Sequence, residues 1–476
     1  MTGKHQSVAN SGAALPKATS DSGRFDWPLA NEAESLLRRH LDYFFEHNSF
    51  ARALARRLRE ETATDFFEWV DHLVLAPSQK TALEAVGFRR QTNIETEQSE
   101  EVYDHPRTTL PRVLLREAGA ASPLEVALRP ESLADFIARQ NLQCEPEGEP
   151  WSRYRRATIS EEHHTKLLAI ERNAYAGFVP ATLQTGELSR ILKAKELWAT
   201  RPRHFAQDAD GFKVASQLCD RVLGLVGRDL ACHLFFETER AYWESRNRAA
   251  RSQKYRQDQL GLGWGNHDHH TFRCSREHFV KLLEFLDKLG FTRREHYYAG
   301  TEAGWGAQIL EQAIARIVVF ADVDLLPEEK GIDFTAAPLP PVSHLGTVGL
   351  WVGLHGESFL EAGMHHLEAR FDFTLLEEQL KRDGVSMMKP FSDFEFLRQA
   401  FTEGERWPVR SERIERLFSA RLITREQFDR FLAEGAIGSH LENLQRHGGF
   451  KGFNQKSVSA IIAATDPRKQ LANKSN

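Results

Sequence analysis

The pattern of apolar and polar positions in residues 266–291 predicts a short strand, a turn and an amphipathic helix. Side chains alternate through residues 268–274, so that His269 and Arg273 share one face of the strand and Phe272 lies on the other. We expect the following helix to pack on the Phe272 face, which leaves the His269 face free to line a cavity. The helix is predicted from apolar residues at helical spacing, namely Phe279, Leu282, Leu283, Phe285, Leu286 and Leu289, before a stop at Gly290.

Residues 70–90 repeat this arrangement. Asp71-His72 opens a short alternating strand, and a helical segment with a Gly-Phe stop follows it. An internal repeat indicates duplicated modules, and we expect the two modules to pair around one central site. His72 and His269 would then be equivalent residues. The alternative is that both are surface or core histidines on unrelated strands.

The remaining pattern divides the chain into five regions. Residues 1–30 are expected to form a disordered tail, and residues 31–145 the N-terminal helices and the first module. Residues 146–263 are predicted to be a helical insertion, residues 264–373 the second module, and residues 374–476 a helical C-terminal region.

Composition narrows the class of protein. The chain has 476 residues, of which 41% are hydrophobic and 27% charged, as in soluble globular proteins. Its formal charge of −5 gives no electrostatic reason to bind nucleic acid or an anionic membrane. No apolar run approaches the roughly 20 residues that span a bilayer, and the N-terminus lacks a signal-peptide core. The four cysteines are far apart, which favours a reducing cytoplasm.

A candidate third ligand lies in residues 364–373. Alternation places Glu368 and Arg370 on a polar face opposite an apolar one. Glu368 together with His72 and His269 would make a 2-His-1-carboxylate triad, the donor set of non-haem Fe(II) oxygenases. The alternative is a solvent-facing ladder in which Glu368 and Arg370 form salt bridges.

These features resemble the vicinal-oxygen-chelate superfamily, in which a histidine at the start of the first strand is a metal ligand. Within that superfamily the chain is similar to the 2-oxoadipate dioxygenase/decarboxylase family, also called hydroxyglutarate synthases. The resemblance covers roughly residues 35–130 and 264–373. The motifs that carry it, in order, are Asp71-His72, residues 111–117, residues 268–271, Leu310-Glu311-Gln312 before residues 316–320, and residues 367–370.

The resemblance implies an α+β fold in which paired βαβββ modules form a half-barrel around a metal site. It implies Fe(II) bound by His72, His269 and Glu368. A 2-oxo acid would chelate the metal and react with O₂, as in the conversion of 2-oxoadipate to 2-hydroxyglutarate with loss of CO₂. No separate 2-oxoglutarate would be needed. The partners expected are therefore a small 2-oxo acid and O₂, and the oligomeric state stays open.

Two further residues are candidates for substrate contacts. The family's arginine four residues after the first histidine is replaced here by Ala76, and Arg273 holds the corresponding place in the second module. We expect Arg273 either to anchor a distal carboxylate or to pair with Glu368 or Asp372. Gln312 is expected to hydrogen-bond the substrate or a metal-bound water.

Two other classes of function fit the same features. One is a metal-dependent isomerase or lyase of the glyoxalase type, which uses metal-bound water without consuming O₂. The other is a non-catalytic protein whose paired modules hold a ligand without metal.

Overall fold

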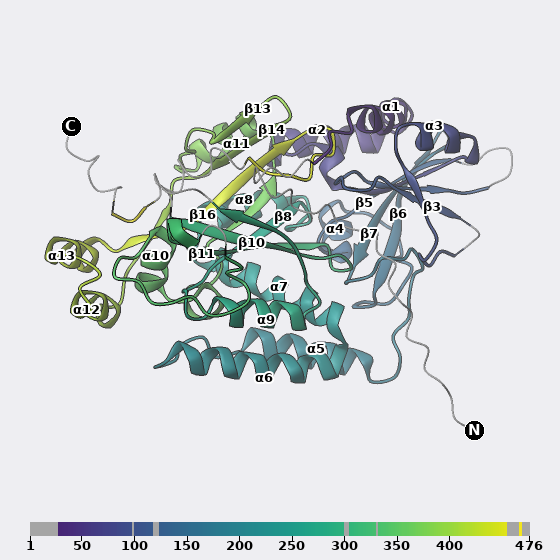
Figure 1. Cartoon of the computed structure of the whole chain (residues 1–476). Helices are drawn as coiled ribbons and strands as arrows, with labels where there is room; N and C mark the ends of the chain where they lie inside the picture. Colours follow the sequence, from purple (N-terminus) through teal and green to yellow (C-terminus); the bar gives the residue numbers. More distant parts are fainter. Residues whose placement is uncertain are drawn as a thin grey trace, which may run out of the picture.

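The computed structural model describes residues 27–97, 100–117, 123–298, 304–329, 332–454 and 466–468. Within these residues the strands form two main sheets, which we call sheet A and sheet B, and helices cover one face of each (Figure 1). No helix in this part of the chain is long and apolar enough to cross a membrane.

Sheet A has the strand order β2-β3-β4-β1-β5-β7-β6. The first strand, β1, runs parallel to β4 and antiparallel to β5, and β5 in turn runs parallel to β7. The sheet therefore consists of two modules that pair edge to edge through β1 and β5. The first contains β1 to β4, and the second contains β5 to β7 and so has one strand fewer. The strands are β1 (Val70–Leu75), β2 (Arg89–Gln91), β3 (Glu101–Asp104), β4 (Arg112–Leu115), β5 (Leu124–Leu128), β6 (Tyr154–Glu162) and β7 (Thr165–Arg172).

Sheet B repeats this plan with the order β13-β14-β16-β12-β8-β11-β10-β9, and β15 pairs with β16 beside this path. β8 runs parallel to β11, β12 runs parallel to β16, and the antiparallel pair β8/β12 joins the halves. The strands are β8 (His267–Arg273), β9 (Thr292–Tyr298), β10 (Trp305–Gln312), β11 (Ile317–Asp324), β12 (His366–Arg370), β13 (Ser392–Phe394), β14 (Leu397–Phe401), β15 (Glu405–Trp407) and β16 (Ala436–Arg446).

The fold is thus α+β with paired modules of the βαβββ plan, as predicted. The way the modules pair differs from the prediction. The module that begins with His72 pairs with the one that begins at β5, in sheet A. The module that begins with His269 pairs with the one that begins at β12, in sheet B. Neither β5 nor β12 opens with Asp-His, so the repeat that revealed two modules could not reveal the other two.

Two regions predicted to be helical also contain strands. β6 and β7 lie within residues 146–263, and β13 to β16 lie within residues 374–476. Ten of the eleven residues of β16 are buried, between β12 on one side and β14 on the other. Its sequence, AIGSHLENLQR, contains good helix formers, but burial in the middle of a sheet overrides that weak intrinsic preference.

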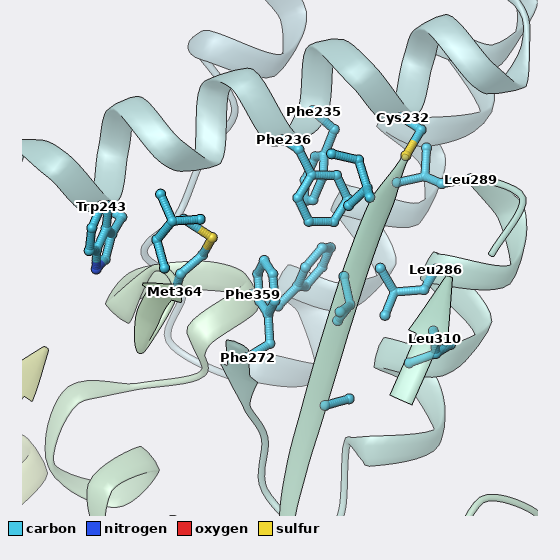
Figure 2. Close-up of a cluster of buried hydrophobic side chains, with 14 of the residues drawn as sticks. Cys232, Phe235, Phe236, Trp243, Phe272, Leu286, Leu289, Leu310, Phe359 and Met364 are labelled. Carbon is cyan, nitrogen blue, oxygen red and sulfur yellow. The ribbon is translucent and has the colours of Figure 1, made fainter. Parts of the chain in front are cut away.

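The helices divide between the two sheets. Helices α1 to α4 share the hydrophobic core of sheet A. Helices α7 to α9 share that of sheet B, and α5 and α6 pack on α7 and α9 as an outer layer (Figure 1). Figure 2 shows part of the hydrophobic core of sheet B, in which the rings of Phe236 on α7 and Phe272 on β8 lie 6.1 Å apart. Gly290, with φ of 87°, ends α9 in the left-handed conformation that favours glycine, as predicted. The helices are α1 (Asn31–His47), α2 (Ser49–Thr62), α3 (Lys80–Ala85), α4 (Leu133–Arg139), α5 (Glu187–Ala199), α6 (Asp208–Val226), α7 (Arg228–Ser245), α8 (Arg248–Gln259), α9 (Phe279–Lys288), α10 (Thr347–His355), α11 (Phe373–Arg382), α12 (Ser411–Ser419) and α13 (Arg425–Glu434).

A buried acid, Asp71, lies where the two sheets meet. It sits at a register shift between β1 and β5, and Arg172 of β7 donates to both of its carboxylate oxygens at 2.9 Å. Arg316, which precedes β11 in sheet B, approaches the same carboxylate at 3.5 Å. Burial acts to raise the pKa of Asp71, but Arg172, His72 and the other nearby arginines outweigh it and hold this pKa well below its ordinary value.

Replacing Asp71 by Asn should therefore destabilise the fold strongly. The change leaves Arg172 buried without its counter-charge, and we expect the free energy of unfolding to fall by about 3–5 kcal/mol at pH 7. The difference from the unmodified protein should shrink as the pH falls below 3.8, the ordinary pKa of Asp, because protonation then removes the same charge. Urea denaturation at several pH values measures both effects.

Asp393 provides the matched control, because it pairs with Arg398 at 2.6 Å on the surface, with 59% of its side chain exposed. Asp393→Asn should cost less than about 1 kcal/mol. Equal losses for the two variants would contradict the role given to Asp71.

Candidate metal centre

Polar side chains from three neighbouring strands meet on the concave face of sheet B. Thr271 of β8 lies opposite His366 of β12, and Glu368 of β12 lies opposite Glu442 of β16. Because side chains alternate along a strand, His269 lies on the same face as Thr271. All five side chains are buried.

Four of these side chains contact one another. Nδ1 of His269 lies 2.9 Å from Oε1 of Glu368, and Nε2 of His269 lies 3.7 Å from Oε2 of Glu442. Nε2 of His366 lies 2.8 Å from the same Glu442 oxygen. One donor atom from each of His269, His366 and Glu442 therefore lies within 4.8 Å of the others, so these residues could hold one ion. Asp268, His269 and Glu368 form a second, overlapping group.

Neighbouring side chains hold the donors in place. Gln399 of β14 donates from Nε2 to Oε2 of Glu368 at 2.9 Å. Oγ1 of Thr271 lies 2.8 Å from Nε2 of His366. The ring of Phe320, on β11, packs against the ring of His269 with centroids 4.2 Å apart. Such outer contacts orient imidazole and carboxylate ligands.

The electrostatics of the group favour a cation. Burial, reinforced by Glu442, raises the pKa of Glu368 to about 7. Burial acts to lower the pKa of His269, but Glu368 and Glu442 outweigh it and raise this pKa to about 10. Two buried carboxylates this close repel each other, and a divalent cation would relieve the repulsion. Imidazole and carboxylate together are the donors of 2-His-1-carboxylate iron sites, so the residues fit Fe(II).

The structure does not bring His72 to this group. Nδ1 of His72 lies 2.8 Å from Asp71 in sheet A, and its ring meets the edge of Phe178 at 4.9 Å. Among the described residues, His72 belongs to neither group of potential metal ligands. This is contrary to the prediction that His72 and His269 share one site, because the two repeated β-α units lie in separate sheets.

Gln312 also lies away from the group. Alternation along β10 turns it toward the helices, where Nε2 donates to Asp229 of α7 at 2.6 Å and Oε1 accepts from the amide of Ala315. Its hydrogen bonds therefore fix the β10–β11 turn against α7 instead of reaching the site.

Arg273 is buried on β8, two positions beyond Thr271 on the same face of the strand. In the described part of the chain no ion pair joins it to Glu368 or to Asp372, and its Nε has no hydrogen-bond partner. Burial lowers the pKa of Arg273 to about 10, against the opposing effect of Asp322. Asp372 instead caps α11, where it accepts from the amide of Leu375 at 3.1 Å. Neither of the ion pairs considered for Arg273 forms, and no carboxylate of a described residue lies within ion-pair distance of its guanidinium, although Asp322 lies opposite it on β11.

Sequence reasoning missed two members of the group, His366 and Glu442. His366 shares the polar face of Glu368, two positions earlier, so alternation alone could have identified it. Glu442 lies in β16, a segment predicted to be helical, and its neighbour in space, Glu368, is 74 residues away in sequence by subtraction of their numbers. No local pattern identifies that pairing.

A cavity of about 50 Å³ adjoins His269 and Glu368. Pockets that hold small molecules have volumes of about 300–1,000 Å³, so an organic acid does not fit. Residues 448–454, which we call the C-terminal strap, close the cavity. Nζ of Lys451 lies 2.7 Å and 2.8 Å from the two carboxylate oxygens of Glu311, and the ring of Phe453 packs on Phe320 at 5.1 Å. The strap must therefore move before an organic molecule reaches His269.

No protein-family model matches the chain, and no match to a curated protein was found. Solved structures that it resembles include one described as a glyoxalase superfamily protein from Ralstonia eutropha JMP134, at 14% identity and a TM-score of 0.31, covering 56% of this chain and 97% of that one. A triple mutant of 4-hydroxymandelate synthase from Streptomyces coelicolor has 14% identity and a TM-score of 0.28, covering 86% and 100% of the two chains. Methylmalonyl-CoA epimerase from Mycobacterium tuberculosis has 11% identity and a TM-score of 0.22, covering 38% and 88%. These likenesses carry no functional information, and function has to follow from the site.

Replacing Lys451 by Met should loosen the C-terminal strap, because it removes both contacts to Glu311. We expect faster amide hydrogen exchange in residues 449–454, with little change in the free energy of unfolding, since a partly exposed ion pair contributes only about 0–1 kcal/mol. Lys389→Met, at an exposed position outside the cavity, is the control. Exchange in the strap that matches the control would show that Lys451 does not hold it closed.

Proposed function

We propose that this protein is a non-haem Fe(II)-dependent dioxygenase that oxidatively decarboxylates and hydroxylates a 2-oxo acid. The observation that carries the proposal is the meeting of two buried imidazoles and a buried carboxylate, from His269, His366 and Glu442, close enough to share one ion. A 2-His-1-carboxylate set leaves positions open for a substrate and O₂.

Glu368 then has a different role from the one predicted. Its Oε1 lies 2.9 Å from Nδ1 of His269, so it can accept a hydrogen bond from Nδ1–H and leave Nε2 of the ring free to bind the ion. Gln399 holds the other oxygen of Glu368. Glu368 is therefore proposed as a positioning residue for His269, with Gln399 behind it.

Fe(II) at this site would supply activation of O₂ beside a chelated 2-oxo acid. The tasks left to the protein are to orient the acid and to exclude water. Aromatic side chains on the concave face of sheet B, among them Tyr297, Phe320 and Phe401, provide an apolar wall for that purpose. The motifs in the sequence favour 2-oxoadipate as the acid, with 2-hydroxyglutarate as its product.

Arg273 is the proposed anchor for the far carboxylate of such a substrate. It is buried, and no carboxylate of the described chain neutralises it within ion-pair distance. A guanidinium binds a carboxylate through two parallel hydrogen bonds. Arg446 is the second candidate, because it lines the cavity beside His269, where it pairs with Asp268.

The metal assignment predicts a set of single substitutions. His269→Ala, His366→Ala and Glu442→Ala should each abolish stoichiometric Fe(II) binding after anaerobic reconstitution, measured by metal analysis. Glu368→Gln should weaken binding by about 10- to 100-fold, as loss of an orienting contact does. His72→Asn should keep full metal content, because His72 lies in the other sheet. The unmodified protein should consume O₂ when 2-oxoadipate is added.

Three outcomes would change the assignment. Stoichiometric iron in the His366 or Glu442 variant would remove that residue from the metal site. Full metal content without O₂ consumption across a panel of 2-oxo acids would favour an isomerase or lyase of the glyoxalase type. A protein that binds no divalent metal at all would favour a non-catalytic ligand-binding role.

The anchor role of Arg273 predicts a selective effect on KM. Arg273→Met should raise KM for 2-oxoadipate by roughly 10- to 100-fold, the loss of one charged hydrogen-bonding group. KM for 2-oxohexanoate, which lacks the second carboxylate, should change little. Arg446→Met, assayed in parallel, decides between the two arginines: a selective effect there and none at Arg273 would assign the anchor to Arg446.

A further inference from the structure

Three arginines, Arg172, Arg316 and Arg112, approach the carboxylate of Asp71 at 2.9, 3.5 and 3.9 Å where sheet A meets sheet B, and a fourth, Arg129, lies near enough to feel its charge. Arg112 lies on β4 opposite His72, Arg129 follows β5, and Arg172 ends β7. Arg316 comes from sheet B, in the turn before β11. The cluster therefore joins side chains from both half-barrels.

The carboxylate of Asp71 is already occupied by part of this cluster. Arg172 donates to both of its oxygens at 2.9 Å, and Nδ1 of His72 lies 2.8 Å from one of them. The guanidinium of Arg316 is at 3.5 Å and that of Arg112 at 3.9 Å. Asp71 thus neutralises Arg172 and leaves the other arginines without a charge partner of their own.

The lack of a carboxylate partner is clearest for Arg112 and Arg129. Nη1 of Arg112 donates to the carbonyl of Ala176 at 2.6 Å, but its buried Nε has no partner within the described residues. The side chain of Arg129 makes no hydrogen bond or ion pair with any described residue. Burial, with Arg316 and Arg172 adding to it, lowers the pKa of Arg112 well below its ordinary value.

One further acid lies near the cluster but does not pair with it. Asp104 of β3 feels the charges of Arg112 and Arg316, yet its carboxylate is held by Gln91 at 2.6 Å. Arg112, Arg129, Arg172 and Arg316 thus outnumber the two carboxylates by two, and Arg370, which is also near, adds no net charge because it pairs with Glu68 at 3.1 Å. Uncompensated charge in a partly buried place is costly, and a bound anion removes the cost.

Two of the guanidiniums are also held in fixed positions. The ring of Phe178 lies under Arg112 at 4.4 Å and under Arg172 at 4.6 Å. Arg172 further donates to the carbonyls of Tyr175 and Gly177. Because Arg112 is ordered in advance, a ligand would lose little binding free energy in ordering that side chain.

We propose that Arg112, Arg129 and Arg316 bind an oxyanion, the carboxylate or phosphate group of a small molecule, at the junction of the two half-barrels. Guanidinium groups match the planar, two-oxygen face that both anions present. Arg112 and Arg129 belong to sheet A, Arg316 belongs to sheet B, and none of the three is a member of the metal group, so the site is separate from the proposed dioxygenase chemistry. Since Arg316 directly precedes β11, which carries Phe320 onto His269, a bound anion would tie sheet A to the strand beside the metal centre.

Anion binding to the full-length protein in EDTA tests the proposal without metal. Inorganic phosphate and glutarate are titrated separately, each against sodium chloride at equal ionic strength. We expect saturable binding at one site by calorimetry for at least one of them, and a rise of Tm with anion concentration. The anion that binds identifies the phosphate or the carboxylate as the group recognised.

Arg129→Gln is the main variant, because Arg129 is half-buried and no hydrogen bond or ion pair joins its side chain to a described residue. It should weaken binding at least tenfold, as should Arg112→Gln, whereas Arg398→Gln on the surface of sheet B should not. In anion-free buffer Arg129→Gln should leave Tm unchanged or raise it, because it removes an uncompensated charge.

Two results would overturn the proposal. One is the absence of saturable binding of both anions to the unmodified protein. The other is unchanged affinity in Arg129→Gln, with Tm lowered in anion-free buffer, which would make Arg129 a structural residue. Since EDTA empties any metal site, neither result bears on the dioxygenase assignment, and loss of iron binding in the His366 variant would not bear on the anion site.

Discussion

The antiparallel pairing of β8 with β12 is the constraint on which the candidate centre depends. Its register sets Thr271 opposite His366, and the bulge that follows lets Glu368 reach the ring of His269. A shift of this register by one residue would turn His366 and Glu368 toward the helices, because side chains alternate along a strand. The apolar residues that alternate with them, Leu367 and Ala369, pack in the core against those helices. Burial of that apolar face therefore fixes the polar side chains on the other face.

The two half-barrels share a backbone plan but place opposite charges at corresponding places. Where sheet B gathers two carboxylates around His269, sheet A surrounds Asp71 with arginines. In sheet A the ring of Phe178 packs on His72 and on the guanidiniums of Arg112 and Arg172. A cation suits the first arrangement and an anion the second, so duplication of the fold has not duplicated the chemistry.

Sequence reasoning succeeded where the signal was local. Alternation and helical spacing identified β8, α9 and the polar face of β12, and so brought His269 and Glu368 into one hypothesis. It failed where the information was non-local. Asp71-His72 is a true repeat of the second opening, but the sheet to which each repeat belongs depends on strand pairing across long stretches of chain. Glu442 was hidden because β16 has helix-forming residues and becomes a strand only through burial between two others.

The C-terminal strap covers the candidate metal centre, so its movement would control both the entry of a substrate and the entry of water. Phe453 packs on Phe320, and Phe320 packs on His269, so the same aromatic stack that closes the cavity also supports a proposed ligand. Displacing the strap to admit an acid would remove one layer of that stack and admit water at the same time. Productive chemistry would then require the strap, or the substrate itself, to cover the opening again before O₂ reacts. If the centre acts as proposed, an acid that spans from His269 to Arg273 would occupy more of the concave face than a shorter one and would leave less room for water beside the imidazoles.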